Sequence, residues 1–154
     1  MKDKTPSFRI YRCSVCGNII VKLNDSGIDP QCCGRDMTEL KPGEGDGNPL
    51  RHVPVWWMEG CKVHVTVGEE PHPMIDSHLI QWILIITNQG MYAKYLTPDS
   101  DSEACFKICK HENVQKVLAY CNIHGLYEAA PVVNDTPDLM EKITKNKYIT
   151  LPEK

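Results

Sequence analysis

Residues 117–125 read Val-Leu-Ala-Tyr-Cys-Asn-Ile-His-Gly, an apolar run that ends in a chelating pair. The β-branched and aromatic residues before the cysteine predict a strand over 114–120, followed by a loop. Cys121 and His124 stand three positions apart in that loop, so that one metal ion can bind both side chains. The segment therefore predicts a metal site at the end of a β-strand.

Three histidines far upstream complete a candidate site with five donors. His72 and His78 flank the expected start of a strand, and His52 is expected to open another strand. Four imidazoles and one thiolate exceed the four ligands of a tetrahedral zinc site. They suit a five-coordinate redox metal with one open position, for which iron is the best candidate. The other two histidines, His64 and His111, are interpreted as ordinary surface or hydrogen-bonded residues.

A second candidate site lies near the N-terminus. Cys13 and Cys16 form a Cys-x-x-Cys knuckle, and the adjacent pair Cys32 and Cys33 follows it. Four thiolates can surround one ion as a tetrahedron, provided that the backbone bends between the adjacent cysteines. For such a site the sequence leaves iron and structural zinc equally open. The remaining cysteines are interpreted as core or surface thiols: Cys61, Cys105 and Cys109.

Composition and charge limit the classes of function. The chain has 154 residues and a formal net charge of −3, and it lacks the basic stripe of a nucleic-acid-binding surface. Its longest strongly apolar run, residues 82–86, is far shorter than the roughly 20 residues of a membrane span. Eight cysteines without a signal peptide favour reduced, metal-binding thiols over a disulfide framework. We therefore expect a cytoplasmic protein that binds neither nucleic acid nor membranes.

Turn residues divide the chain into segments. Residues 1–41 are expected to form a small four-cysteine domain that needs its metal, because it has few apolar side chains. Residues 42–49 are rich in Gly and Pro and are expected to form a linker or mobile loop. Residues 50–130 contain six short strand-like segments separated by turn signals, which predicts an antiparallel β-sandwich: 53–57, 62–67, 78–87, 91–96, 104–108 and 114–120.

Three further elements are predicted outside the sandwich. Two strands are expected in the four-cysteine domain, over 8–12 and 18–23. In the extension 131–154, Thr136 followed by Pro137 favours the start of a short amphipathic helix. The predicted fold class is thus mainly β, with one short helix in the C-terminal extension.

Several stretches together resemble the desulfoferrodoxins, the two-iron class of superoxide reductase. They span residues 8–127 and read Tyr-Arg-Cys-Ser-Val-Cys-Gly-Asn at 11–18, Cys-Cys-Gly at 32–34, His-Val-Pro-Val at 52–55, Pro-His-Pro-Met at 71–74, His-Leu-Ile-Gln-Trp-Ile at 78–83 and Ala-Tyr-Cys-Asn-Ile-His-Gly-Leu at 119–126. The resemblance implies a desulforedoxin-like first domain followed by an immunoglobulin-like β-sandwich. The extension after Tyr127 is longer than the resemblance leads us to expect.

The resemblance also implies two iron ions and a reaction. The first iron would bind Cys13, Cys16, Cys32 and Cys33, and the second would take His52, His72, His78 and His124 as equatorial ligands with Cys121 as the axial ligand. The implied reaction reduces superoxide to hydrogen peroxide without forming dioxygen. A rubredoxin-like carrier would re-reduce the iron, and the chain would form a homodimer.

The chain departs from the family at two positions. Leu50 and Arg51 stand where the family has Glu-Lys. Leucine cannot bind a metal, so we expect water, hydroxide or an external anion in place of the glutamate. Arg51 retains the positive charge that attracts superoxide, but a guanidinium is a poor proton donor. An alternative is that Lys41 or Glu44 replaces the missing ligand, at the entropic cost of ordering the glycine-rich stretch.

Two other functions are compatible with the sequence. One is an electron-transfer or redox-sensing module in which Leu50 has blunted catalysis. The other is a zinc-stabilised interaction domain that uses only the four N-terminal cysteines.

Overall fold

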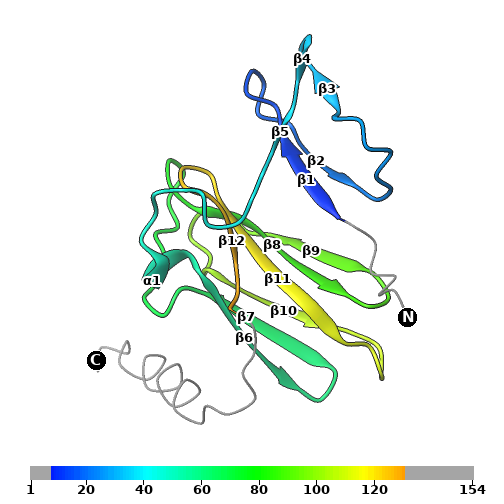
Figure 1. The fold of residues 1–154 in the computed structure, drawn as a ribbon. Coiled ribbons are helices and arrows are strands. Elements are labelled where there is room, and N and C mark those ends of the chain that lie inside the picture. Colours follow the sequence, from blue (N-terminus) through cyan, green and yellow to red (C-terminus); the bar gives the residue numbers. More distant parts are fainter. Residues whose placement is uncertain (1–7, 131–154) are drawn as a thin grey trace.

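The computed structural model describes residues 8–130, and almost all of their regular structure is β (Figure 1). This confirms the predicted fold class, whereas the helix expected from Thr136 lies outside the described residues. Within residues 8–130 no helix has the length and apolar character needed to cross a membrane. In chain order the elements are β1 Arg9–Arg12, β2 Ile19–Lys22, β3 Gln31–Cys32, β4 Arg35–Asp36, β5 Thr38–Glu39, α1 Pro49–His52, β6 Pro54–Glu59, β7 Lys62–Val67, β8 Ile80–Thr87, β9 Met91–Tyr95, β10 Glu103–Lys107, β11 Val114–Cys121 and β12 Gly125–Glu128.

The N-terminal part is a small β unit. Strand β1 pairs antiparallel with β2 on one side and with β5 on the other, and β3 and β4 form a separate hairpin. The buried cluster around its cysteines is small and consists of Tyr11, Cys13 and Met37. So few buried apolar side chains support the expectation that a bound metal contributes much of the stability of this unit.

The following part is a sandwich of two antiparallel sheets, as predicted. One sheet has the strand order β10-β7-β6 and the other the order β12-β11-β8-β9. In β7 every second residue is buried, so that Val63, Val65 and Val67 point into the core. They meet Ile83, Ile85 and other buried side chains of the opposite sheet.

Strand β8 is apolar on both faces because both faces of its sheet are covered. Its outer side chains Leu84 and Ile86 belong to a cluster that includes Ile10 of β1, with Ile19 and Val21 of β2 packed against it. The N-terminal unit therefore lies against the outer face of the four-stranded sheet. Burial on two faces accounts for the continuous apolar run at residues 82–86, because a strand with one exposed face alternates instead.

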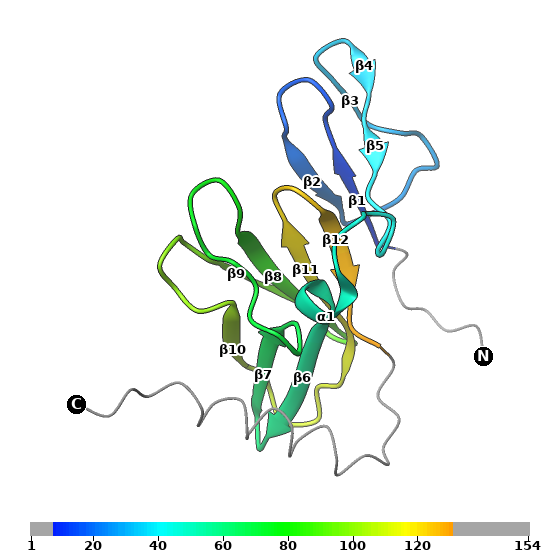
Figure 2. The ribbon, with the colours of Figure 1, turned by 90° about the vertical axis from the view of Figure 1, so that its left-hand side faces the viewer.

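The prediction that His52 opens a strand is wrong. His52 is the last residue of α1, and β6 begins two residues later at Pro54 (Figure 2). The physical cause is local: the side chain of Asn48 accepts a hydrogen bond from the backbone N–H of Leu50 at 3.0 Å, and Pro49 occupies the first helical position. Strand β12 was also missed, because the four residues of Gly125–Glu128 are too few to show a period.

Residues 42–48 contain no helix or strand, and they run along β12. The backbone N–H of Gly43 donates a hydrogen bond to the carbonyl of Leu126 at 2.8 Å. The N–H of Gly47 donates to the hydroxyl oxygen of Tyr127 at 2.9 Å. The stretch is thus tied to the sandwich at two points.

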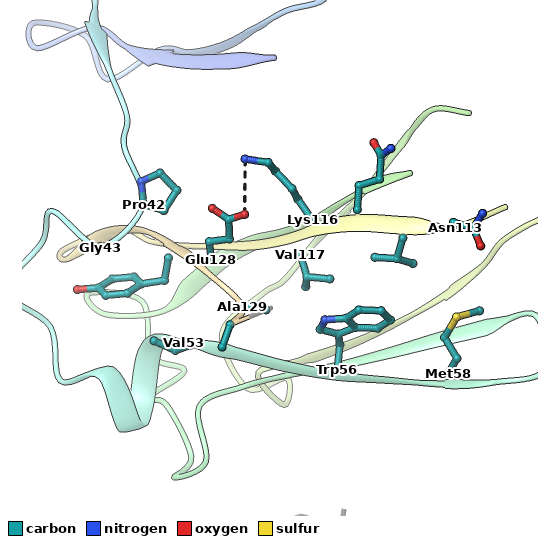
Figure 3. Close-up of a pocket in the computed structure, with 14 residues that line it drawn as sticks. Pro42, Gly43, Val53, Trp56, Met58, Asn113, Lys116, Val117, Glu128 and Ala129 are labelled. Carbon is teal, nitrogen blue, oxygen red and sulfur yellow. Dashed lines mark ion pairs between the residues drawn. The ribbon is translucent and has the colours of Figure 1, made fainter. Parts of the chain in front are cut away.

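A groove of about 930 Å³ opens where the two sheets end side by side (Figure 3). Strands β6 and β12 are edge strands of their sheets, and the groove lies beside both. Trp56 and Met58 line one wall, and an ion pair between Lys116 and Glu128, with 3.6 Å between nitrogen and oxygen, spans part of the other (Figure 3). None of the cysteines or histidines singled out as ligands lines this groove, so it is not the metal site.

Candidate metal centres

The nine candidate ligands gather into two groups. Within each group the potential ligand atoms all lie within 4.8 Å of one another, and the described residues contain no other group of this kind. The first group is Cys13, Cys16, Cys32 and Cys33, and the second is His52, His72, His78, Cys121 and His124. Glu44, considered as an alternative ligand, is exposed and belongs to neither group, and Lys41 is exposed as well.

The sulfur atoms of the first group have the spacing of a tetrahedral metal site. The Sγ atoms of Cys16 and Cys32 lie 3.6 Å apart, and those of Cys32 and Cys33 lie 3.9 Å apart. A tetrahedral ion with bonds of about 2.3 Å separates its sulfurs by about 3.8 Å. Cys33 adopts a φ of 52°, a left-handed conformation that supplies the bend expected between adjacent cysteines.

The electrostatics of the first group also require a cation. Backbone N–H groups of Cys16 and Val15 lower the pKa of Cys13 to about 6, which favours its thiolate form. The neighbouring sulfur of Cys16, followed by those of Cys32 and Cys13, raises the pKa of Cys33 to about 12. Four thiolates this close repel one another, so a bound cation is needed to ionise them together.

The nitrogen atoms of the second group have the spacing expected around one ion. His52 Nε2 lies 3.0 Å from His124 Nδ1 and 3.1 Å from His72 Nε2. Two nitrogens that each lie about 2.1 Å from one ion, at right angles to each other, are separated by about 3.0 Å. The Sγ atom of Cys121 completes the group 3.6 Å from His124 Nδ1.

Backbone acceptors determine which nitrogen of His52 and His72 faces the centre. His52 Nδ1 lies 2.8 Å from the carbonyl oxygen of Asn48, and His72 Nδ1 lies 2.6 Å from that of Pro73. A carbonyl can only accept, so both Nδ1 atoms carry the hydrogen and both Nε2 atoms present lone pairs. Two lone pairs directed at each other repel unless a cation lies between them. In metal-binding histidines the other ring nitrogen usually donates to a carbonyl or carboxylate in this way.

His78 supplies a third lone pair. Its Nε2 atom is buried and has no hydrogen-bond partner. Buried polar atoms without a hydrogen-bond partner are rare in native proteins, and binding of a metal ion is one of the few explanations for such an atom. A metal at the centre of the second group would satisfy this nitrogen together with those of His52 and His72.

Burial keeps the imidazoles in the form that binds metal. It lowers the pKa of His72 to about 4, and it also lowers the pKa of His52 and of His78. These side chains are therefore neutral at pH 7, and only a neutral imidazole has a free lone pair for a metal.

The ligands come from three places along the chain, and a neighbouring residue joins two of these places by hydrogen bonds. His52 ends α1, His72 and His78 lie in the loop before β8, and Cys121 ends β11. Asn122 joins the last two: its side-chain oxygen accepts from Leu79 N at 3.0 Å, and its side-chain nitrogen donates to Ser77 O at 3.1 Å. This side-chain bridge holds the Cys121–His124 loop against the loop of His78.

Sequence reasoning missed the residues that form the back wall of the second group. A Cβ atom added at Gly45 would lie 1.7 Å from the carbonyl oxygen of His124, and one added at Gly47 would lie 2.8 Å from His52 Cε1. Only glycine fits at these two positions. The spacing of Gly43, Gly45 and Gly47 was the available signal, and it indicates close packing of backbone as readily as a flexible linker.

The two departures from the family lie on α1. Leu50 is 48% exposed and Arg51 is also exposed at the surface. The Arg51 guanidinium Nε donates to a carboxylate oxygen of Glu70 at 3.0 Å, and the backbone N–H of Glu70 donates to the carbonyl of Leu50 at 2.9 Å. The turn that carries Glu70 is thus attached to α1, and no local sequence pattern indicates this ion pair.

Comparison with known proteins agrees with this arrangement. A family model described as desulfoferrodoxin matches residues 46–130, and one described as desulfoferrodoxin, N-terminal domain, matches residues 5–40. The desulfoferrodoxin homolog of Methanothermobacter thermautotrophicus is 42% identical over 123 residues, which cover 80% of this chain and 98% of the relative. The superoxide reductase of Thermococcus kodakarensis is 34% identical over 101 residues, which cover 54% of this chain and 88% of the relative.

A solved structure shows the same fold. The superoxide reductase from Treponema pallidum superposes with a TM-score of 0.70 at 23% identity, covering 82% of this chain and 99% of that one. The match with the larger family model spans more than half of the chain. The two predicted metal-binding parts of the sequence, their geometry and these matches agree, and the chain belongs to the desulfoferrodoxin family.

Proposed function

We propose that this protein is a superoxide reductase with a mononuclear non-haem iron in the second group. One superoxide ion accepts one electron and two protons and leaves as hydrogen peroxide. The observation that carries the proposal is the convergence of four imidazole nitrogens and one thiolate on a single point. Family membership and the name of the Thermococcus kodakarensis relative support the same reaction.

The donor set suits a redox metal better than zinc. Zinc in a structural site is satisfied by four ligands, whereas the second group offers five. We assign His52, His72 and His78 through Nε2, His124 through Nδ1 and Cys121 through Sγ as ligands of this iron. When bound, iron in its ferrous form supplies the electron, and a thiolate ligand favours its release to an oxygen species.

The protein positions and shields these ligands. Cys121 is fully buried, and the backbone N–H of His124 lies 3.5 Å from its sulfur, so water does not reach the thiolate. Carbonyls of Asn48 and Pro73 hold the rings of His52 and His72 in one orientation. The protein thus fixes the five donor atoms before the metal binds, which reduces the rearrangement that electron transfer requires.

Residues on α1 govern access in this proposal. The side chain of Leu50 has no oxygen or nitrogen atom, so the sixth position is left to water, hydroxide or an external anion. Arg51 attracts superoxide by its charge, and water delivers the protons because a guanidinium retains its own. With the five ligands, Arg51 completes the proposed catalytic set.

We assign a second iron to Cys13, Cys16, Cys32 and Cys33, where zinc is the alternative occupant. We further propose that the chain is divided into a four-cysteine domain at 1–41, a connecting stretch at 42–49, a catalytic sandwich at 50–130 and an extension at 131–154. A rubredoxin-like carrier is the proposed electron donor, and a homodimer is the proposed assembly.

The test mixes pre-reduced protein with superoxide and counts the products. One peroxide per superoxide, without dioxygen, supports the reductase. Ferrous protein that does not react with superoxide would instead indicate an electron-transfer or sensing module. Metal analysis separates the third function, since zinc in the four-cysteine site with an empty histidine group would indicate an interaction domain.

A further inference from the structure

Tyr127 lies beside the proposed iron site but supplies no ligand. It belongs to β12, is 4% exposed, and its ring centroid lies 4.9 Å from that of His52. Any influence of this hydroxyl on the site must pass through its hydrogen bonds.

Both hydrogen bonds of the hydroxyl go to the backbone of Gly47. The N–H of Gly47 donates to the Tyr127 oxygen at 2.9 Å, and the hydroxyl donates to the carbonyl of Gly47 at 3.5 Å. The two residues are 80 positions apart in the sequence. Tyr127 therefore ties the glycine-rich stretch to β12 at one buried point.

That point is directly connected to two of the proposed ligands. The next residue, Asn48, presents the carbonyl that accepts from His52 Nδ1 at 2.8 Å. A Cβ atom added at Gly47 would lie 2.8 Å from His52 Cε1 and 2.9 Å from His124 Cβ, so the backbone fills the space behind both rings. A shift of Gly47 must therefore displace the Asn48 carbonyl or the rings themselves.

We infer that Tyr127 is a positioning residue: its hydroxyl fixes Gly47, and through the carbonyl of Asn48 it fixes the orientation of the His52 ring. The inference rests on the proposed function, because it concerns a ligand of the proposed iron. The inference concerns the hydroxyl group alone, because the aromatic ring would fill the same space without the hydroxyl.

The test is Tyr127→Phe, which keeps the ring and removes the oxygen. The amide hydrogen of Gly47 in the metal-free protein should exchange about tenfold faster, as expected for the loss of one buried hydrogen bond. Metal should leave the five-donor site to a chelator about tenfold faster, because hydrogen-bond partners that orient a metal ligand contribute to metal affinity. Metal release from the four-cysteine site should not change.

Tyr92→Phe is the matched control. Its hydroxyl donates to Glu112 at 2.9 Å, beside the start of β11, whereas Cys121 lies at the end of that strand. This variant should lower the stability to unfolding and leave Gly47 exchange and metal release unchanged. The inference is overturned if Tyr127→Phe keeps the wild-type rates of Gly47 amide exchange and metal release, or if the two variants change these rates equally. A wild-type protein that binds no metal at the histidines would refute the proposed function, and Gly47 exchange would still decide whether Tyr127 ties this stretch.

Discussion

His52 Nε2 and His72 Nε2 lie 3.1 Å apart, although neither atom has a hydrogen to donate to the other. The hydrogens are on the Nδ1 atoms, where the carbonyls of Asn48 and Pro73 accept them. The folded chain therefore holds two lone pairs against each other, an arrangement that is favourable only around a cation. Protonation would relieve this repulsion in one ring but would place a charge in a buried site.

The metal-free protein should lose stability as the pH falls below 6.5. Burial lowers the pKa of His72 to about 4 in the folded state, whereas the unfolded chain binds a proton near 6.5. Between these values the unfolded state binds more protons, so the free energy of unfolding decreases with decreasing pH. His72 alone contributes a loss of up to about 3 kcal/mol.

Urea unfolding of the metal-free protein between pH 7.5 and pH 5 measures this dependence. His72→Gln is the comparison, because glutamine does not titrate and should remove much of the slope in this interval. Equal slopes in the two proteins would show that the burial of His72 does not control the acid response.

Arg51→Ala should slow the capture of superoxide by the reduced enzyme. Attraction between a guanidinium and an anion raises the encounter rate. Removing one such charge should therefore lower this rate about two- to tenfold at low salt. The rate should also become less sensitive to ionic strength, because salt screens only the charges that remain. Pulse radiolysis or stopped-flow kinetics at several salt concentrations measures both effects.

Glu70→Gln provides the opposite change at the same place. It removes the carboxylate that lies 3.0 Å from the Arg51 guanidinium, so capture should become faster and more sensitive to salt. Lys116→Ala removes a positive charge beside the groove and should alter neither quantity as much. If Arg51→Ala and Glu70→Gln both keep the wild-type salt dependence, Arg51 has no part in steering.

Leu50→Glu should restrict access to the proposed sixth position. With leucine, azide should bind the oxidised site and shift its thiolate-to-iron absorption band. A carboxylate two residues before His52 should compete with azide and weaken its binding by at least about tenfold, as a local chelating ligand does. Leu50→Gln is the control of similar size without the charge, and equal azide affinities in the two variants would place residue 50 outside the coordination sphere.

Local patterns predicted much of this structure. The strand at Lys62–Val67 has strict alternation, and Cys13, Cys16, Cys121 and His124 have chelating spacing, so both could be recognised within a few residues. The closeness of His52 to His72 and His78 depends on the whole sandwich, and it was expected from the donor types and the family resemblance.

The parts that were missed depend on contacts between distant segments. The helix at Pro49–His52 is only four residues long, too short for a periodic signal. Gly45 and Gly47 were interpreted as signs of a linker, because nothing in the local sequence shows that His124 packs against them. The ion pair of Arg51 with Glu70 joins residues 19 positions apart and likewise has no local pattern.

Glu112→Gln should destabilise the sandwich without affecting either metal group. The buried carboxylate accepts hydrogen bonds from the Thr87 hydroxyl, from the Tyr92 hydroxyl at 2.9 Å and from the N–H of Cys109 at 3.0 Å. In glutamine an NH2 group replaces one of the two accepting oxygens, so that a donor faces another donor. This should lower the free energy of unfolding by about 2 kcal/mol. Chemical unfolding measures this loss, and metal content should not change.

The pH dependence of the contribution of Glu112 to stability provides a control for this prediction. The hydrogen bond from Thr87 and two further donors lower the pKa of Glu112, so its contribution is complete above about pH 4.5 and is lost as the pH falls through its folded pKa. The difference between wild type and Glu112→Gln should therefore shrink in acid. Glu44→Gln, at an exposed position, should match wild type throughout.

Gly45→Ala should selectively empty the five-donor site. The added methyl group would lie 1.7 Å from the carbonyl oxygen of His124, so the glycine-rich stretch or the Cys121–His124 loop must move. Displacement of a ligand loop should lower metal affinity by about 10- to 100-fold, while the four-cysteine site keeps its metal. Gly90→Ala is the matched control, because nothing lies within 4 Å of the added carbon there. Metal analysis after dialysis against a chelator compares the variants, and a Gly45→Ala protein that retains both metals would show that the stretch does not support the ligands.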